Sequence, residues 1–451
     1  MKLDWLLSRF ATVPTHAAFV HQDRKVTYAQ LLELISSFVD RLNHEGVRFG
    51  ERVVVLGDYT PESFALMLAL AQNSNIVIPL TRDSVVEVDA ALAISGSDWL
   101  FVFEVDGRAF TISKHQIDSE NELLKSFIAT SAAGLILFSS GSTGRPKAIL
   151  HDFERVTKKF LVQRDPVVAI PFLMFDHFGG FNTVFAITAS LGTVVSVEDR
   201  SVKSICEAIE VHQVSLLPTT PSFLNLMTAF NAHRIYDLSS LRRITYGTEI
   251  MPQTTLTRLQ GSFPNAKLQQ TYGLSEVGVL GSKSRNDGSL WMRIGGNGFQ
   301  TKIVDGILWV KSDFSMVGYL NADSGFDDDG WFNTQDRVEV EGEYFKILGR
   351  DSDLINVGGQ KVYPAEIEDV IMKLSNVVDV AVSGESNAIL GQIIIAKVVV
   401  KEPELVNDLK SRVRMACKKS LTAFKVPARV IIVEGQLYTS RQKKKRTANV
   451  Q

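Results

Sequence analysis

The sequence predicts an α/β protein with a large N-terminal domain and a small C-terminal domain. Short β-branched runs alternate with segments of helical periodicity up to about Gly295, which favours parallel sheets with covered faces. Beyond Gly295 the runs pair as strands joined by tight turns, a small β-barrel-like part. Another helix and more short strands follow Arg350. We therefore expect an N-terminal domain over residues 1–350 and a mobile α+β domain over residues 351–451.

The expected elements follow in chain order. Helical spacing, or a start at Thr, Ser or Tyr before an apolar period, predicts helices over residues 27–47, 60–74, 201–213, 220–230 and 363–374. Runs rich in Val, Ile and Leu predict strands at 52–58, 76–80, 192–197, 214–219, 377–384 and 392–400. Two hairpins are expected within residues 301–312 and 336–350.

Composition and charge narrow the class of protein. The 451 residues carry a formal net charge of -2, which gives no electrostatic case for nucleic acid as a partner. The only cysteines, Cys206 and Cys417, form neither a disulfide framework nor a zinc motif, and suit a reducing compartment. No run approaches the ~20 apolar residues of a spanning helix, and the N-terminus does not read as a signal peptide. We expect a cytoplasmic protein with no membrane span.

The stretch "SSGSTGRPK" (139–147) has the composition of an anion-binding loop. It lies between the expected strand "GLILF" (134–138) and the segment "AILHDFERVTKKF" (148–160), which we expect to be helical. Glycines let backbone N–H groups converge on phosphate oxygens, and Ser and Thr hydroxyls add further donors. The pattern is not a Walker motif, because Ala148 follows Lys147. A phosphate loop of another kind is predicted.

Four further stretches occur in a fixed order after it: "QTYGLSE" (270–276), "GWFNTQD" (330–336), "LGRDSDLINVGGQKVYPAEIE" (348–368) and "TSRQKKKR" (439–446). Together with residues 139–147 they resemble the adenylate-forming superfamily of acyl- and aryl-CoA ligases, luciferases and peptide-synthetase adenylation domains. The resemblance covers nearly the whole chain. It implies that a carboxylic acid is joined to AMP from ATP with release of pyrophosphate, and that the acyl group then passes to a thiol.

The resemblance also implies roles for the nucleotide-binding residues. The phosphates of ATP would be held by Ser140, Gly141, Ser142, Thr143, Gly144 and Lys147, with Thr143 counted as catalytic. Such donors are needed because charge develops on pyrophosphate as it leaves. Tyr272 would stack on adenine, Ser275 would contact the α-phosphate, and Glu276 would ligate Mg²⁺, which prefers carboxylate oxygen.

The next matched residues lie around the expected domain junction. Asp336 would bind the ribose hydroxyls, although Gln335 before it replaces the glycine that is usual there, and Arg350 would reach the ribose and phosphate. Ser352 falls at the hinge position. The loop containing Gly358 and Gly359 would line the path of the thiol, which is either CoA or the phosphopantetheine of an acyl carrier protein.

The basic tail resembles the family's C-terminal lysine motif but does not match it at every position. Aligned on Thr439, the catalytic lysine falls at Lys443, but Lys444 is an open alternative because the register could slip by one. A fixed cation is required there, since bringing a carboxylate to a polyphosphate joins two anions.

The stretch "PFLMFDHFGGFN" (171–182) corresponds to the family's acyl pocket and leaves two readings open. His177 followed by two glycines resembles CoA ligases, whereas Phe175-Asp176 resembles amino-acid adenylation domains, where the aspartate grips an ammonium group. We assign Asp176, His177, Gly247 and Gly273 to the substrate, with His177 also catalytic, and favour a plain acid. Gly247, Thr248 and Glu249, in "TYGTEIMP" (245–252), should line the site.

The expected activity is therefore that of an AMP-forming acid–thiol ligase with ATP, Mg²⁺ and CoA. Two alternatives stay open: an adenylase that loads an acyl or amino acid onto a carrier protein, and a degenerate member that binds nucleotide without turnover.

Overall fold

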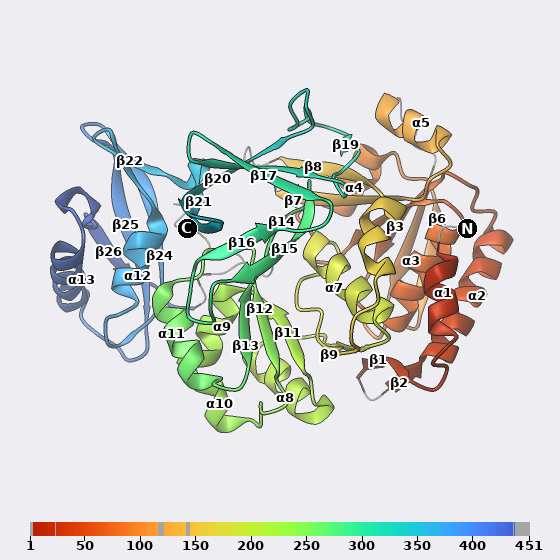
Figure 1. Cartoon of the computed structure of the whole chain (residues 1–451), viewed down its shortest axis with the longest axis horizontal. Coiled ribbons are helices and arrows are strands. Elements are labelled where there is room, and N and C mark those ends of the chain that lie inside the picture. The colour runs from red at the N-terminus through yellow and green to blue at the C-terminus, as the bar shows by residue number, and fades with distance from the viewer. Residues whose placement is uncertain (1–2, 23, 116–120, 141–144, 436, 438–451) are drawn as a thin grey trace.

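The computed structural model describes residues 3–22, 24–115, 121–140, 145–435 and 437. Its N-terminal part contains two sheets of seven strands each, with the expected helices packed between and around them (Figure 1). The C-terminal strands and helices form a separate unit at one end of the molecule (Figure 1). The predicted fold class, α/β layers in a large N-terminal part with a small α+β C-terminal unit, is confirmed, whereas the part expected to be β-barrel-like is an open antiparallel sheet.

The first sheet is parallel except at one edge, where β2 runs antiparallel to β1. Its order is β13-β12-β11-β9-β10-β1-β2. The strands are β1 (Ala17–His21), β2 (Arg24–Thr27), β9 (Val168–Ala169), β10 (Thr193–Ser196), β11 (Leu216–Thr219), β12 (Arg243–Tyr246) and β13 (Lys267–Gln270). The carboxyl ends of β11, β12 and β13 lie at one edge, where ligands bind in open α/β sheets.

The second sheet has a parallel centre, β7-β4-β3-β5, flanked by antiparallel strands in the order β19-β8-β7-β4-β3-β5-β6. Its strands are β3 (Arg52–Leu56), β4 (Ile76–Leu80), β5 (Trp99–Phe103), β6 (Phe110–Lys114), β7 (Gly134–Ser140), β8 (Pro146–Asp152) and β19 (Gly318–Tyr319).

The helices of the N-terminal part are α1 (Asp4–Phe10), α2 (Tyr28–Glu45), α3 (Pro61–Gln72), α4 (Val88–Ser95), α5 (Glu122–Ala129), α6 (Phe153–Thr157), α7 (Phe178–Ala189), α8 (Val202–His212), α9 (Pro221–Ala229), α10 (Ala232–Ile235) and α11 (Gln253–Ser262). Helix α3 is buried from Pro61 to Ala71, and its residues share one core with the first two sheets. A helix that is apolar all round is expected to be buried on all sides. Its start is fixed by a capping box between Thr60 and Ser63.

The segment after "SSGSTGRPK" corrects one expectation. Residues 146–152 form strand β8, antiparallel to β7, and only the short helix α6 begins at Phe153. Periodicity cannot separate a short buried strand from a buried helical turn, and here the apolar run Ala148–Leu150 is buried between β7 and β19. The predicted phosphate loop therefore joins two strands of a hairpin, and no helix begins directly after it.

A third, antiparallel sheet extends from this region toward the C-terminal unit. Its order is β14-β15-β16-β21-β20-β18-β17. The strands are β14 (Tyr272–Leu274), β15 (Gly278–Ser284), β16 (Met292–Gly295), β17 (Phe299–Val304), β18 (Ile307–Ser312), β20 (Phe332–Glu341) and β21 (Tyr344–Arg350). The expected hairpins are β17–β18 and β20–β21.

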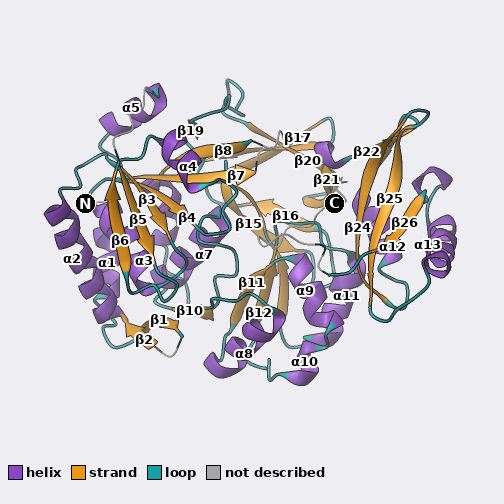
Figure 2. Ribbon diagram, turned by 180° about the vertical axis from the view of Figure 1, so that it is seen from behind, coloured by secondary structure: helices purple, strands orange, loops and turns teal. Residues whose placement is uncertain are grey.

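The C-terminal unit follows directly on β21, and Figure 2 shows its sheet beside helices α12 and α13. Its elements are β22 (Ile355–Val357), β23 (Gln360–Val362), α12 (Pro364–Ile371), β24 (Val377–Asn387), β25 (Gly391–Val400), α13 (Val406–Ser420) and β26 (Arg429–Ile432). It has its own hydrophobic core. The predicted boundary at Arg350 coincides with the end of β21 and stays a prediction.

Side chains of α9 and α11 connect the C-terminal unit to the rest of the chain. Asn225 Nδ2 donates to the carbonyl of Val378 at 2.9 Å, and Arg258 Nη2 donates to the carbonyl of Met372 at 2.9 Å. The backbone N–H and hydroxyl of Thr254 both donate to Asp369 Oδ1 at 3.0 Å. We call these three contacts, each of which joins α9 or α11 to the C-terminal unit, the α9–α11 contacts.

Within the described residues, no helix has the length and apolarity to cross a bilayer.

Candidate active site

A cavity of about 580 Å³ opens at the carboxyl ends of β11, β12 and β13. Thr219 is the last residue of β11, Gly247 and Thr271 directly follow β12 and β13, and all three line the cavity. A Cβ on Gly247 would come within 2.5 Å of Thr271 Oγ1 and 2.9 Å of the Thr271 carbonyl oxygen, so only glycine fits between the strand ends. We call this the larger cavity.

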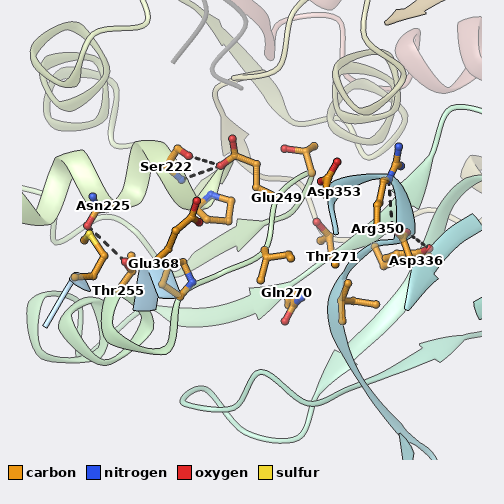
Figure 3. Close-up of a pocket in the computed structure, with 18 of the residues that line it drawn as sticks. Ser222, Asn225, Glu249, Thr255, Gln270, Thr271, Asp336, Arg350, Asp353 and Glu368 are labelled. Carbon is orange, nitrogen blue, oxygen red and sulfur yellow. Dashed lines mark hydrogen bonds and ion pairs between the residues drawn. The ribbon is translucent and has the colours of Figure 1, made fainter. Parts of the chain in front are cut away.

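A second cavity of about 380 Å³ adjoins it at the junction with the C-terminal unit (Figure 3). The two share wall residues, among them Thr248, Tyr272 and Arg350. We call it the smaller cavity. Thr248 has φ +68°, a conformation that a β-branched residue adopts only where the surroundings impose it, as at functional sites.

Tyr272, Asp336 and Arg350 form a connected group where the two cavities meet. The Tyr272 hydroxyl donates to Asp336 Oδ2 at 2.6 Å, and Arg350 Nε donates to Oδ1 at 3.2 Å (Figure 3 shows the second bond). Burial raises the pKa of Asp336 above its ordinary value, although Arg350 and the Tyr272 hydroxyl favour the charged carboxylate. The group thus presents a buried anion that is held in place from both sides.

Gln335 shows how the chain manages without the usual glycine. Its φ is +60°, the left-handed region, and its backbone N–H donates to Asn333 Oδ1 at 2.9 Å. The residue before Asp336 in strand β20 is therefore kept in a conformation typical of glycine, at a cost of about 1 kcal/mol for a residue with a Cβ.

Lys147, Tyr319 and Glu276 gather at the phosphate-loop side of the larger cavity. Lys147 Nζ lies 4.8 Å from the centre of the Tyr319 ring, and the Tyr319 hydroxyl donates to Glu276 Oε1 at 2.8 Å. Glu276 Oε2 has no hydrogen-bond partner among the described residues, so it can serve as a cation ligand. Three metal-ligating side chains do not cluster anywhere in the described ranges, so a bound cation would need oxygens from a ligand or water.

The strand that carries Lys147 is fixed by Asn321. Its Nδ2 donates to the Pro146 carbonyl at 2.9 Å, and its Oδ1 accepts from the Ala148 N–H at 2.9 Å. Both backbone groups that flank Lys147 are thereby held by one side chain from beyond β19. This contact positions the lysine on the cavity wall.

His177 caps helix α7 and lines the larger cavity. Its Nδ1 accepts from the Gly179 N–H at 2.9 Å, so a neutral ring carries its proton on Nε2. A Cβ on Gly180 would lie 2.2 Å from the Tyr59 hydroxyl and 2.3 Å from the Met174 carbonyl, which explains the second glycine.

Asp176, one residue earlier, is buried and does not belong to the described wall of either cavity. The Ser84 hydroxyl donates to its Oδ2. Arg200 is near enough that Asp176 contributes, after Asp58, to raising the pKa of the guanidinium against the effect of burial. The carboxylate is thus surrounded by groups of the protein.

The structure brings most of the predicted site residues together. The larger cavity is lined by Lys147, His177, Gly247, Thr248, Tyr272, Gly273, Ser275, Glu276 and Arg350, and the smaller by Thr248, Glu249, Tyr272, Gly273, Asp336 and Arg350. Glu249 is held there by the backbone N–H of Ser222 at 3.3 Å (Figure 3). The strand that carries Ser140 ends beside this wall, since Ser140 pairs with Pro146.

Other predicted residues lie elsewhere. Gly358 and Gly359 form the exposed turn between β22 and β23, outside both cavities, with φ +58° and +83°. Gly141, Ser142, Thr143, Gly144, Lys443 and Lys444 fall outside the described residues.

Sequence reasoning missed several members of the site. Tyr319 and Asn321 carry no motif beyond their ordinary polarity, and Gln270 begins the stretch "QTYGLSE" without a role assigned to it by the resemblance. Gln270 belongs to the smaller cavity, and its Oε1 is buried with no partner among the described residues. Its position, two residues before Tyr272 in the same stretch, could have indicated it.

Comparison with known proteins agrees with this arrangement. Residues 7–320 match the AMP-binding enzyme family, and residues 366–444 match the AMP-binding enzyme C-terminal domain. The long-chain-fatty-acid–CoA ligase FadD13 of Mycobacterium tuberculosis is 27% identical over 483 residues, which cover 96% of this chain and 95% of that protein. The 2-succinylbenzoate–CoA ligase of Bacillus subtilis is 25% identical over 470 residues, covering 96% and 94%.

Solved structures show the same fold. The anthranilate CoA ligase AuaEII in complex with anthranoyl-AMP superposes with a TM-score of 0.83 at 18% identity, over 98% of this chain and 95% of that one. ATP-bound MatB from Rhodopseudomonas palustris gives a TM-score of 0.79 at 22% identity, over 98% and 97%. With both family domains matched in order and the predicted motifs gathered around one pair of cavities, this chain belongs to the AMP-binding enzyme family.

Proposed function

We propose that this protein is an ATP-dependent acid–CoA ligase, which forms an acyl adenylate and then transfers the acyl group to a thiol. One observation carries the proposal. The buried carboxylate of Asp336, the side chains of Lys147 and Glu276, and the helix capped by His177 line two adjoining cavities. Relatives that align over nearly the whole chain are named as CoA ligases, which supports the same reaction class.

The junction of the two cavities suits a nucleoside. Asp336 can accept from ribose hydroxyls with the lone pairs that Tyr272 and Arg350 leave available. The buried Oε1 of Gln270 is an acceptor of the kind that an exocyclic amine of adenine needs. Tyr272 provides ring surface beside both groups.

In the first half-reaction, a carboxylate oxygen of the acid attacks the α-phosphorus of ATP. The bond from that phosphorus to the bridging oxygen breaks, and pyrophosphate leaves with the electron pair. Lys147 and the donors of residues 140–144 would stabilise its charge, and Lys443 would offset the repulsion between the two anions. Mg²⁺, for which Glu276 Oε2 is a suitable ligand, would supply further positive charge at the phosphates when bound.

In the second half-reaction, a thiolate sulfur attacks the acyl carbonyl carbon and AMP leaves as the phosphate. The turn at Gly358 and Gly359 lies away from the cavities, so we propose that the C-terminal unit rotates about Ser352 to bring it to the thiol's path. The acceptor proposed is CoA, and the phosphopantetheine of a carrier protein is the alternative that the experiment below separates.

An exchange assay tests the first step. Labelled pyrophosphate should enter ATP only when a suitable acid is present, and a panel of aliphatic, aromatic and amino acids would identify it. Added CoA should then release AMP and give the acyl thioester. If AMP is released with a carrier protein and not with CoA, the acceptor is the carrier protein. ATP binding with no exchange for any acid would contradict the proposal and favour a non-catalytic nucleotide-binding protein.

A further inference from the structure

Two polar side chains in the wall of the larger cavity have no hydrogen-bond partners among the described residues. Thr219, at the end of β11, is 4% exposed and its hydroxyl oxygen is buried and unpaired. Asn182, in α7, has its Oδ1 buried and unpaired in the same way. A buried polar atom without a hydrogen bond destabilises the folded protein, and native proteins keep few of them.

Their neighbours show that the fold could satisfy such groups. The hydroxyl of Thr183, next to Asn182 on the same wall, donates to the Gly179 carbonyl at 2.7 Å. The hydroxyl of Thr220, next to Thr219, accepts from the Phe223 N–H at 3.2 Å and caps α9. The two unpaired side chains are therefore a feature of the cavity wall and not of polar residues in these elements generally.

We take the part of the larger cavity where these side chains lie as the site of the acyl group. The nucleotide side is formed by Tyr272, Arg350 and the group around Glu276, whereas Asn182 shares α7 with His177 at its cap. The rest of this side includes the apolar residues Leu173, Phe178 and Val279. Polar groups that converge on a pocket beside apolar side chains fix the orientation of a ligand.

The charged residues of the cavity wall limit which substituent the acid can carry. The acidic residues of the larger cavity's wall are Glu276 and Asp323, and neither comes from α7 or β11. An ammonium group on the acid would thus meet no carboxylate from these two elements, whereas a neutral hydroxyl or aromatic amine can both donate and accept. A half-turn of the Asn182 amide exchanges its two ends, so either end can face the ligand.

We propose that the acid carries a neutral hydroxyl or amino substituent on its acyl part, and that Asn182 and Thr219 bind this substituent. The inference rests on the proposed function, because it takes the larger cavity as the acyl site. The substrate class is a small hydroxy- or amino-substituted acid, with hydroxybenzoates and aminobenzoates as the direct probes. An unsubstituted acyl group would bury both side chains without partners, and sites of this kind reject such analogues strongly.

The test compares matched pairs of ligands. Benzoate and its 2-, 3- and 4-hydroxy and amino derivatives are assayed for kcat/KM in pyrophosphate exchange. The wild type should favour at least one substituted acid over benzoate by about tenfold or more. Thr219→Val and Asn182→Leu, which keep the shape and remove the polar group, should each bring that ratio toward one.

Two control variants separate this role from a structural one. Thr219→Ser retains the hydroxyl and should retain the preference. Thr183→Val removes a hydroxyl from the same wall that is already satisfied by Gly179, and should leave the selectivity ratio unchanged. A preference for benzoate over every derivative, or a preference for a derivative that survives both Thr219→Val and Asn182→Leu, would overturn the proposal.

Binding without turnover keeps this test independent of the proposed function. Non-hydrolysable sulfamoyl analogues of benzoyl-AMP and hydroxybenzoyl-AMP are titrated by calorimetry against the wild type and the two variants. Tighter binding of the substituted analogue, lost in the variants, would support the subsite even if exchange were absent. Equal binding of the two analogues by the wild type would overturn the subsite even if exchange occurred.

Discussion

The phenol of Tyr272 and the carboxylate of Asp336 are joined by a hydrogen bond of 2.6 Å between residues 64 positions apart. The carboxylate is buried, so this donor and Arg350 determine how readily it stays charged. Tyr272 thus has two contributions to the site, a ring on the cavity wall and a proton donor to the proposed ribose-binding group.

Tyr272→Phe keeps the ring and removes the donor. We expect ATP affinity to fall about tenfold, as for loss of ~1.5 kcal/mol from a charged hydrogen bond. The pKa of Asp336, already raised by burial, should rise further, so the loss should be largest at low pH and the affinity profile should move to higher pH. Calorimetric titration of ATP between pH 5.5 and 8 measures both effects; an unchanged profile would show that Asp336 does not bind the ribose.

Gln335→Gly should stabilise the protein. The residue has φ +60°, which costs about 1 kcal/mol for a side chain with a Cβ and little for glycine. Denaturant unfolding should show a gain of roughly this size. Gln335→Ala retains the Cβ and is the matched control, expected to be near neutral; equal gains in both variants would locate the effect in the glutamine side chain instead.

His151 should make the protein sensitive to acid. It is fully buried, both ring nitrogens lack partners among the described residues, and burial, with a smaller effect of Arg155, lowers its pKa from 6.5 to about 3. Between these values the unfolded chain binds the proton and the folded chain does not. Stability is therefore complete above pH 6.5 and falls as the pH decreases toward 3, by about 1.4 kcal/mol per pH unit from this group.

His151→Leu removes the titrating ring. We expect higher stability at pH 7.5, because two unpaired polar atoms are removed, and a shallower loss between pH 6.5 and 5. Thermal unfolding across this range measures the slope. His44→Leu is the control for loss of an exposed imidazole, since the His44 side chain is 79% exposed, and an equally shallow slope in this variant would contradict the assignment to His151.

The turn at Gly359 allows the two half-reactions to be separated. An added Cβ would meet nothing within 4 Å, so Gly359→Trp should leave pyrophosphate exchange intact in the arrangement described here. It should slow acyl transfer to CoA by about tenfold or more if this turn enters the thiol's path. Gly359→Asn, which tolerates φ +83°, controls for backbone strain.

Lys443→Ala should give the opposite result, with exchange lost and transfer from supplied acyl-AMP retained. If Lys444→Ala loses exchange and Lys443→Ala does not, the catalytic register is shifted by one residue. If Lys443→Ala and Gly359→Trp each abolish both half-reactions, the tail and the turn at Gly359 do not serve separate steps, and this prediction is wrong.

Asp176→Asn should change activity little. The Ser84 hydroxyl donates to its Oδ2, and the residue lies outside the described walls of both cavities, so we expect no contact with an ammonium group of the substrate. Exchange rates for an amino acid and its deaminated analogue, measured in wild type and Asp176→Asn, decide the point. If the wild type prefers the amino acid and the variant does not, the substrate is an amino acid whose ammonium group binds Asp176.

The predictable parts of the fold are those encoded locally. Helix α3 begins where Thr60 and Pro61 indicate, and the buried strands β3 and β4 are continuous Val and Ile runs. The hairpin strand β8 was not predictable, because a seven-residue segment with a short apolar core gives no period that excludes a helix.

The site divides in the same way. Motif residues such as Tyr272 and Glu276 could be found from sequence because their spacing is local. Their partners could not: Tyr319 lies 43 residues from Glu276, Ser84 lies 92 residues from Asp176, and Asn321 lies 173 residues from Ala148. Such pairings depend on how the sheets come together, and a single hydroxyl or amide carries no sequence signal of that.

The α9–α11 contacts have a consequence for timing. Asn225, Thr254 and Arg258 offer a handful of hydrogen bonds, each worth about 1 kcal/mol net, to hold the C-terminal unit. Hydrogen bonds of this total strength favour one orientation of the C-terminal unit by only a few kcal/mol. Their release therefore needs no unfolding of the C-terminal unit or of the rest of the chain. Each catalytic cycle could then break and re-form these hydrogen bonds thermally, so that residues of α9 and α11 would influence the rate of turnover.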